Sequence, residues 1–118
     1  MDMAVRPWQY ASTDYRRGID FMPAYVHVNL RVIDPVRQAA LAPRFKAALE
    51  EAGGRILYFG RVAEILEGDE TPLPMAGVFE FPTLTQALAF YNSENYAPIK
   101  VERQEAQQAR MFVVEVSP

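Results

Sequence analysis

Residues 24–35 read AYVHVNLRVIDP and predict a strand that leads directly into a helix. Side chains alternate strictly along the stretch, which is typical of a strand with two different faces. The first face takes the aliphatic side chains Val26, Val28, Leu30 and Val32. The second face takes the polar side chains Tyr25, His27, Asn29 and Arg31. Asp34 then supplies a helix N-cap, and Pro35 suits the first helical position.

The remaining elements follow outward from this stretch. The first helix should run to about Ala52 and stop at Gly53-Gly54, and Pro43 should kink it or split off its first turn. Strands are predicted over 55–66, with a bend near Gly60, and over 75–81. Thr83 and Gln86 form a capping box that begins a second helix. A further helical piece should run from about Ala97-Pro98 to about Gln108, before a last strand over 110–116.

The resulting order, β-α-β-β-α-β, predicts an α+β, ferredoxin-like fold with one four-stranded antiparallel sheet. Both helices should cover one face of that sheet. The other face would then lack a cover from its own chain, so we expect a second subunit to cover it by two-fold symmetry, forming a dimeric α/β barrel.

Length and composition limit the classes of protein. The 118 residues suit one domain, which we place at 23–118, preceded by an N-terminal extension at 1–22. The extension mixes charges with aromatic residues without a period, so it is expected either to be loose or to pack on the body or on a partner subunit. The net charge of −3 and the pI near 5.1 argue against a nucleic-acid partner.

Absent features narrow the expectations further. The chain has no cysteine, which excludes disulfides and thiolate chemistry. No apolar stretch approaches the length of a transmembrane helix, and the N-terminus lacks the apolar core of a signal peptide. We therefore predict a cytoplasmic protein with no membrane partner. No cofactor motif is present, and the single histidine lacks metal-ligand spacing, so neither a cofactor nor a metal is expected.

The sequence resembles the family called domain of unknown function 1330, of the dimeric α/β-barrel superfamily, over about residues 23–117. Thr83 stands where the family commonly has Ser, and Glu94-Asn95 where it has Pro-Glu. The resemblance implies the fold and a homodimer but supplies no reaction, although the superfamily includes small monooxygenases and haem-degrading enzymes. The segments that carry it are Gly53-Gly54-Arg55, Glu67-Gly68, Glu80-Phe81-Pro82, Tyr91-x-Ser93-x-x-Tyr96 and Arg103.

Assignment of the strand faces gives the candidate site. Phe79 and Phe81 of the third strand, and Phe112, Val114 and Val116 of the last, should face the helices. The opposite face should carry Glu80, with Met111, Val113 and Glu115. Because the first strand should lie between the third and the last, Tyr25 and His27 should approach Glu80 and Glu115.

This polar face supports two hypotheses. In the first, the protein binds or transforms a small metabolite in a cleft between sheet and helices, with His27 as acid or base, Glu80 or Glu115 orienting it, and Asn29 or Arg31 holding an oxyanion. In the second, the same side chains form a satisfied network that fixes a non-catalytic dimer.

The helical segments supply three further candidate ligand-binding residues. Tyr91 and Tyr96 have hydroxyls that could reach a ligand at the mouth of the cleft. Arg103 could do the same, or pair with Glu80 or Glu102.

Overall fold

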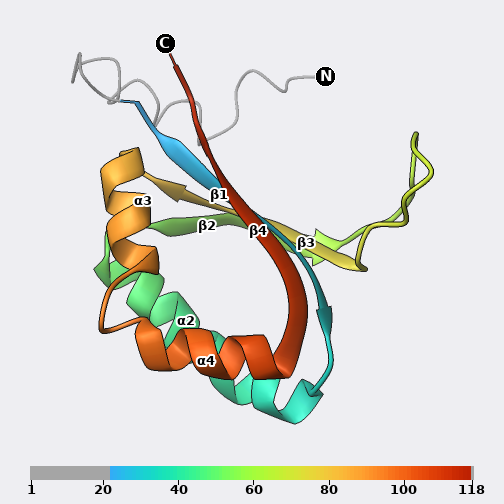
Figure 1. Ribbon diagram of the computed structural model, residues 1–118, viewed down its shortest axis with the longest axis horizontal. Coiled ribbons are helices and arrows are strands. Elements are labelled where there is room, and N and C mark those ends of the chain that lie inside the picture. Colours follow the sequence, from blue (N-terminus) through green and yellow to red (C-terminus); the bar gives the residue numbers. More distant parts are fainter. Residues whose placement is uncertain (1–21, 118) are drawn as a thin grey trace.

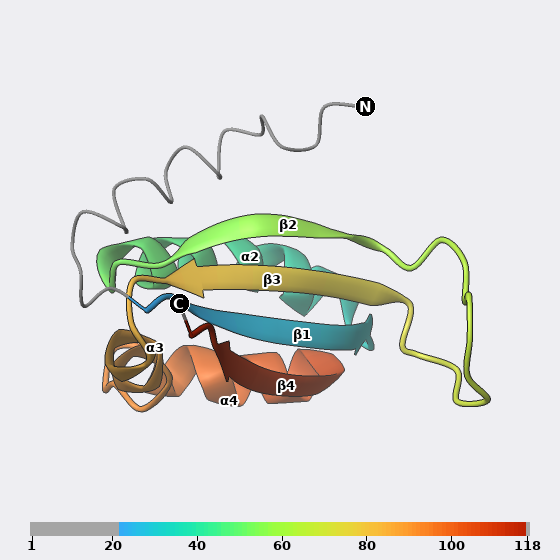
Figure 2. The same cartoon turned by 90° about the horizontal axis from the view of Figure 1, so that it is seen from above.

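Four antiparallel strands form one sheet (Figure 1), in the order β2-β3-β1-β4 that Figure 2 shows. The structure is a computed structural model that describes residues 22–117. Its strands are β1 (Ala24–Val32), β2 (Arg55–Arg61), β3 (Met75–Phe81) and β4 (Gln107–Glu115). β1 pairs with β3 on one side and β4 on the other, both antiparallel, as the sequence predicts. The fold is therefore the predicted α+β, ferredoxin-like arrangement.

Three helices lie on one face of this sheet: α2 (Pro35–Glu51), α3 (Leu84–Tyr91) and α4 (Ala97–Ala106) (Figure 2). The predicted caps are present. A side-chain oxygen of Asp34 accepts from the amide of Arg37, and Thr83 Oγ1 accepts from the amide of Gln86. Each cap satisfies an amide that the first turn leaves without a helical partner.

Pro43 does not split off the first turn of α2, which is one of the two outcomes that the sequence predicts, and the kink stays a prediction. The helix runs without interruption from Pro35 to Glu51. Pro43 lies on the exposed side of α2. Water can satisfy the carbonyl that loses its partner there, so the chain tolerates the missing N–H group.

Two other element boundaries differ from the sequence prediction. β2 ends at Arg61, and its irregularity lies between Ile56 and Tyr58 instead of at Gly60. α4 ends at Ala106 and passes straight into β4, whose pairing with β1 begins at Gln107. The carbonyl of Ala106 accepts hydrogen bonds from the amides of Ile33 and Asp34, which fixes this junction to the end of β1.

The core lies between the sheet and the helices. Leu49 of α2, Phe81 of β3 and Tyr96, next to α4, have no exposed surface. Phe45 and Phe90 form an aromatic cluster with Phe81 and Tyr96, in which the ring centroids of Phe90 and Tyr96 are 4.5 Å apart. Aromatic rings carry much of the buried area of a small domain, so this cluster anchors the helices to the sheet.

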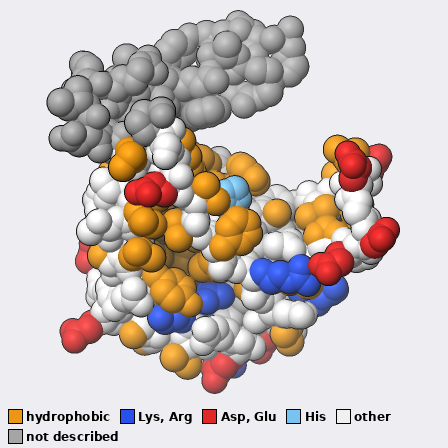
Figure 3. All heavy atoms as spheres, turned by 45° about the horizontal axis from the view of Figure 1, so that its top comes forward, with side chains coloured by type: hydrophobic (Ala, Val, Ile, Leu, Met, Phe, Trp, Pro, Cys, Tyr) orange, Lys and Arg blue, Asp and Glu red, His pale blue; other side chains and the backbone are white. Residues whose placement is uncertain are grey.

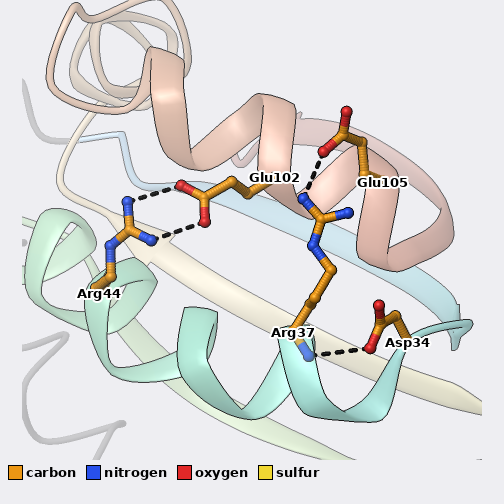
Figure 4. A network of polar contacts seen from close by, with 5 residues as sticks. All are labelled: Asp34, Arg37, Arg44, Glu102 and Glu105. Carbon is orange, nitrogen blue, oxygen red and sulfur yellow. Dashed lines mark hydrogen bonds and ion pairs between the residues drawn. The ribbon is translucent and has the colours of Figure 1, made fainter.

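Two ion pairs tie α2 to α4 on the outer surface (Figure 4). Arg44 donates two hydrogen bonds to Glu102, each of 2.8 Å, and Arg37 donates one to Glu105 over 2.6 Å. The hydrogen bond from Arg44 lowers the pKa of Glu102. Both pairs are solvent-exposed, so each should add little to the stability of the fold.

The predicted facing of the last strand is wrong. His27 pairs with Phe112 and Val26 with Val113, so Phe112 and Val114 share the open face with His27. Met111 and Val113 pack against the core instead. Because side chains alternate along a strand, an error of one residue in the facing turns every side chain of the strand over.

The N-terminal extension at 1–22 falls almost entirely outside the described residues, and so does its predicted packing. Within residues 22–117, no helix is long and apolar enough to cross a membrane.

Candidate functional site: a cavity between sheet and helices

A cavity of about 160 Å³ lies between the sheet and helices α2 and α4. Most of its wall is apolar. Every strand of the sheet contributes, because the inward positions of neighbouring strands meet on one face. The apolar wall includes Val28, Leu30, Leu41, Phe45, Ile56 and Phe59.

The β2 side of the cavity depends on a glycine in β3. A Cβ atom added at Gly77 would lie 2.6 Å from the ring of Phe59, so only glycine leaves room for that ring. Ile56 and Phe59 remain partly exposed at 39% and 46%, although both belong to the helix-covered face. Exposed apolar side chains beside a cavity mark its open side, which is therefore the β2 edge.

Three polar side chains form one corner of the cavity: Gln38, Arg103 and Gln107. Arg103 is 7% exposed and Gln107 5% exposed. Nε of Arg103 donates to the hydroxyl of Tyr96 over 2.9 Å, and Nη1 donates to Oε1 of Gln107 over 3.4 Å. Gln107 in turn donates to Oε1 of Gln38 over 2.8 Å. The chain of bonds fixes the guanidinium group at the cavity.

Helical spacing on α4 places Arg103 in this corner. Ile99, Arg103 and Ala106 are the buried residues of the helix, separated by four and three positions. Residues with this spacing share one helix face. Arg103 therefore points inward with two apolar neighbours, whereas Glu102 and Glu105 point outward to α2.

The polar corner provides donors without a base. The cavity lining includes an arginine and two amides, and neither a carboxylate nor a histidine belongs to it. Such a set can bind and polarise an oxygen atom of a ligand. General-base chemistry would need a group from the ligand or from elsewhere.

Glu80 lies on the opposite, open face of the sheet, and it is 3% exposed. Its carboxylate accepts from Nε of Arg55 over 2.6 Å and from the hydroxyl of Tyr25 over 2.9 Å. Burial, followed by the hydrogen bond to Glu80, raises the pKa of Tyr25 to about 12. The group is a satisfied ion pair with a tyrosine donor, as expected for a buried carboxylate.

His27 shares the face of Glu80 but does not bond to it. Its ring stacks on Phe112, with centroids 5.0 Å apart and planes at 7°. Across the other edge of β1, its pairing partner is Val78. His27 therefore lies among apolar neighbours. The carboxylate of Glu80 is hydrogen-bonded to Tyr25 and Arg55 instead.

The side chain of Asn29 is hydrogen-bonded to the backbone of the chain just before β3 and at its start. Its amide nitrogen donates to the carbonyls of Leu73 and Met75, each over 2.8 Å, and its oxygen accepts from the amide of Leu73 over 2.9 Å. These bonds hold the end of the 62–74 loop against β1. Arg31, the other predicted oxyanion donor, is exposed near the end of β1.

Glu115 is not near His27, because it pairs with Ala24 on the helix-covered face at the end of the sheet. The predicted approach of these two residues is wrong. Tyr91 is half-buried on α3 and does not line the cavity, and Nζ of Lys100 lies 4.1 Å from the centroid of its ring. Tyr96 and Arg103 do meet, as the hydrogen bond between them shows.

Sequence reasoning missed the residues that line the cavity. Gln38 and Gln107 were not identified, nor was the apolar wall. A signal was present, because Gln38, Leu41, Ala42 and Phe45 follow each other at helical spacing, so Gln38 continues the apolar stripe of α2 toward the sheet. A polar side chain on the buried stripe of a helix indicates a buried polar contact.

The sequence matches the family described as "Domain of unknown function (DUF1330)" over residues 23–117. The chain belongs to this family. No curated protein matches this DUF1330 chain.

Several solved structures share its fold. RPA0582, a protein of unknown function from Rhodopseudomonas palustris, is 16% identical, with a TM-score of 0.65 over 97% of this chain and 98% of its own. SnoaB, a cofactor-independent oxygenase from Streptomyces nogalater, is 5% identical, with a TM-score of 0.54 over 83% and 94%. A dimeric ferredoxin-like protein of unknown function from Thermobifida fusca is 12% identical, with a TM-score of 0.51 over 79% and 92%. At these identities the likeness shows the fold alone.

Proposed function

We propose that this DUF1330 protein binds a small organic molecule in the cavity between its sheet and its helices. The observation that carries the proposal is the cavity itself, an apolar space with a single polar corner at Arg103 and Gln107. Ligand sites combine these features, because apolar walls provide affinity and a few fixed polar groups provide orientation.

The volume limits the size of the ligand. An apolar cavity of roughly 150 Å³ is large enough for benzene. The cavity of about 160 Å³ therefore suits a molecule built on a single ring or a short branched chain. A longer ligand would have to extend past Ile56 and Phe59 at the open side.

Binding is the activity that the lining supports. SnoaB is described as a cofactor-independent oxygenase, so the fold is compatible with chemistry that uses no cofactor, although fold alone does not transfer a reaction. The catalytic roles predicted for His27 and Glu80 would belong to the open face, and they stay predictions.

Substitution of one wall residue tests the proposal. Ala42 lines the cavity from α2 and is exposed at its outer side, so Ala42→Phe should narrow the cavity without disturbing the core. Ala47, also exposed on α2 but outside the lining, gives the matched control Ala47→Phe. The probes are benzyl alcohol, benzamide and benzoate, titrated against the ¹⁵N-labelled protein and followed by amide chemical shifts.

We expect at least one probe to shift amides around the cavity in the wild type and in Ala47→Phe. The same probe should bind at least about tenfold more weakly to Ala42→Phe, because its ring has to occupy the space that the new phenylalanine takes. Equal affinity for both variants, or no binding of any probe to the wild type, would refute the proposal.

A second proposal concerns the open face of the sheet. Tyr58, Phe112 and Val114 are exposed there at 57%, 59% and 40%, and in the part of the chain that the structure describes no helix covers them. Figure 3 shows hydrophobic side chains around the pale blue of the single histidine, His27. We propose that a second copy of the chain covers this face, because an exposed apolar patch favours association.

A further inference from the structure

Arg103 carries a buried positive charge without a countercharge. The residue is 7% exposed, and its hydrogen-bond partners, Tyr96 and Gln107, are both neutral. Within residues 22–117, no carboxylate lies within 4.0 Å of its guanidinium group. A guanidinium group does not give up its proton in a protein, so the charge persists. Buried charges are normally paired, which makes this one an exception that calls for a partner.

The carboxylates nearest to Arg103 in sequence already form ion pairs with other residues. Glu102 binds Arg44 and Glu105 binds Arg37, both on the outer surface between α2 and α4 (Figure 4). Glu80, which the sequence offered as another partner, binds Arg55 on the opposite face of the sheet. None of the three can neutralise Arg103 without breaking an existing ion pair.

One nitrogen of the guanidinium group of Arg103 keeps its hydrogen-bonding capacity. Nη2 of Arg103 has no hydrogen bond to any described residue. No fully buried side-chain nitrogen or oxygen of the described residues lacks a partner, so Nη2 keeps accessible surface. Arg103 lines the cavity, so Nη2 is the donor of this side chain that remains available to a ligand there.

We infer that the ligand of this cavity is a small carboxylate, with its anionic group on Arg103 and its apolar body against Leu30, Leu41 and Phe45. The inference rests on the proposed binding function and names the class of ligand. A carboxylate matches the planar fork of an arginine and neutralises its charge. Gln38 and Gln107 line the same corner of the cavity, and the hydrogen bonds from Arg103 to Gln107 and from Gln107 to Gln38 hold it in place.

A pair of isosteric probes tests the inference. Benzoate and benzamide have nearly the same shape, but at pH 7 only benzoate is charged. Dissociation constants for both would be measured by amide shifts on the wild type, on Arg103→Met and on Arg103→Lys. Arg110→Gln is the matched control, because it removes an equal charge from an exposed position of β4 that does not line the cavity.

We expect the wild type and Arg110→Gln to bind benzoate at least about tenfold more tightly than benzamide, as a charge-assisted bond in a desolvated site implies. Arg103→Met should lose this preference and still bind benzamide. Arg103→Lys should keep part of the preference for benzoate, because lysine retains the positive charge but lacks the planar guanidinium group.

The outcomes separate the two claims. Equal affinities of the wild type for benzoate and benzamide would overturn the inference and leave the binding function standing. Failure of both probes to bind would overturn the inference, and failure of benzyl alcohol as well would overturn the binding function. If Arg103→Met does not fold, the comparison of the two probes on the wild type and Arg103→Lys still decides the question.

Discussion

The hydroxyl of Tyr96 accepts a hydrogen bond from Nε of Arg103 over 2.9 Å, and both side chains are buried. Burial raises the pKa of Tyr96, and the neighbouring charge of Arg103 opposes that rise. The bond joins the aromatic cluster of the core to the polar corner of the cavity. It therefore links the stability of the fold to the position of the proposed binding group.

Tyr96→Phe should destabilise the protein by about 1–3 kcal/mol, because Nε of Arg103 loses its acceptor in a buried place. The phenyl ring keeps the contacts with Phe45 and Phe90, so packing changes little. Urea unfolding measures the difference. Tyr91→Phe is the control: among the described residues the hydroxyl of Tyr91 has no hydrogen-bond partner, so its free energy of unfolding should stay within about 0.5 kcal/mol of the wild type. Equal losses in the two variants would contradict this account.

The pKa of Tyr25 predicts a loss of stability at high pH. In the folded protein this pKa is about 12, raised from 10.0, so the folded state favours the protonated phenol. The contribution is complete below pH 10 and is lost as the pH rises from about 10 to about 12. Urea unfolding at about pH 9 and about pH 11 should show a larger loss in the wild type than in Tyr25→Phe. The same loss in both proteins would show that Tyr25 does not titrate in this way.

Asn29→Ala should loosen the 62–74 loop. The substitution removes three hydrogen bonds to Leu73 and Met75, and Leu73 is buried, so we expect a loss of about 1–3 kcal/mol. Hydrogen exchange should also be faster at the amide of Leu73. Arg31→Ala, two residues along the same face, is the control and should leave that amide protected. Unchanged exchange in Asn29→Ala would show that the loop is held by other contacts.

Gly54→Ala should be destabilising, whereas Gly60→Ala should be tolerated. A Cβ atom at Gly54 would lie 2.7 Å from the ring of Phe81 and 2.9 Å from Cδ1 of Leu49, both fully buried. At Gly60 the added atom meets nothing within 4 Å. Thermal and urea unfolding should show a cost of about 1–3 kcal/mol for Gly54→Ala, as for other overpacked cores. A larger effect at Gly60 would contradict the described packing.

Phe112→Glu should separate the proposed dimer. The charge would lie in the middle of the apolar open face, where the ring of Phe112 now stacks on His27. Light scattering during size exclusion should give the mass of two chains for the wild type and of one chain for the variant. Val36→Glu places the same charge on α2, at a side chain 79% exposed, and should not change the mass. A monomeric wild type would refute the dimer.

Local patterns were sufficient to predict most of the fold. The alternation of residues 24–32 gave β1 its bounds, and the residues Asp34 and Thr83 gave two helix starts, because caps and strand faces depend on near neighbours. β4 was harder. Its sequence, QQARMFVVE, has apolar side chains on both faces, so alternation cannot say which face is inward.

The candidate site was predicted less well than the fold. The sequence identified Tyr25, Glu80, Tyr96 and Arg103 as residues of interest, but it grouped Arg103 with the wrong carboxylates. Their true neighbours come from different elements: Arg55 from β2 beside Glu80, and Gln107 from the junction of α4 and β4 beside Arg103. The first contact depends on the register of β2 against β3, and the second on where α4 ends and β4 begins, and neither is marked clearly in the sequence.

The central claim is that a small carboxylate binds between the sheet and the helices. Intermolecular NOEs between the ring protons of benzoate and the methyl groups of the protein test it most directly. Binding in the cavity predicts NOEs to Leu30, Leu41 and Ile56, which line it. NOEs to Val78 and Val114 on the open face, without any to these three residues, would contradict the claim.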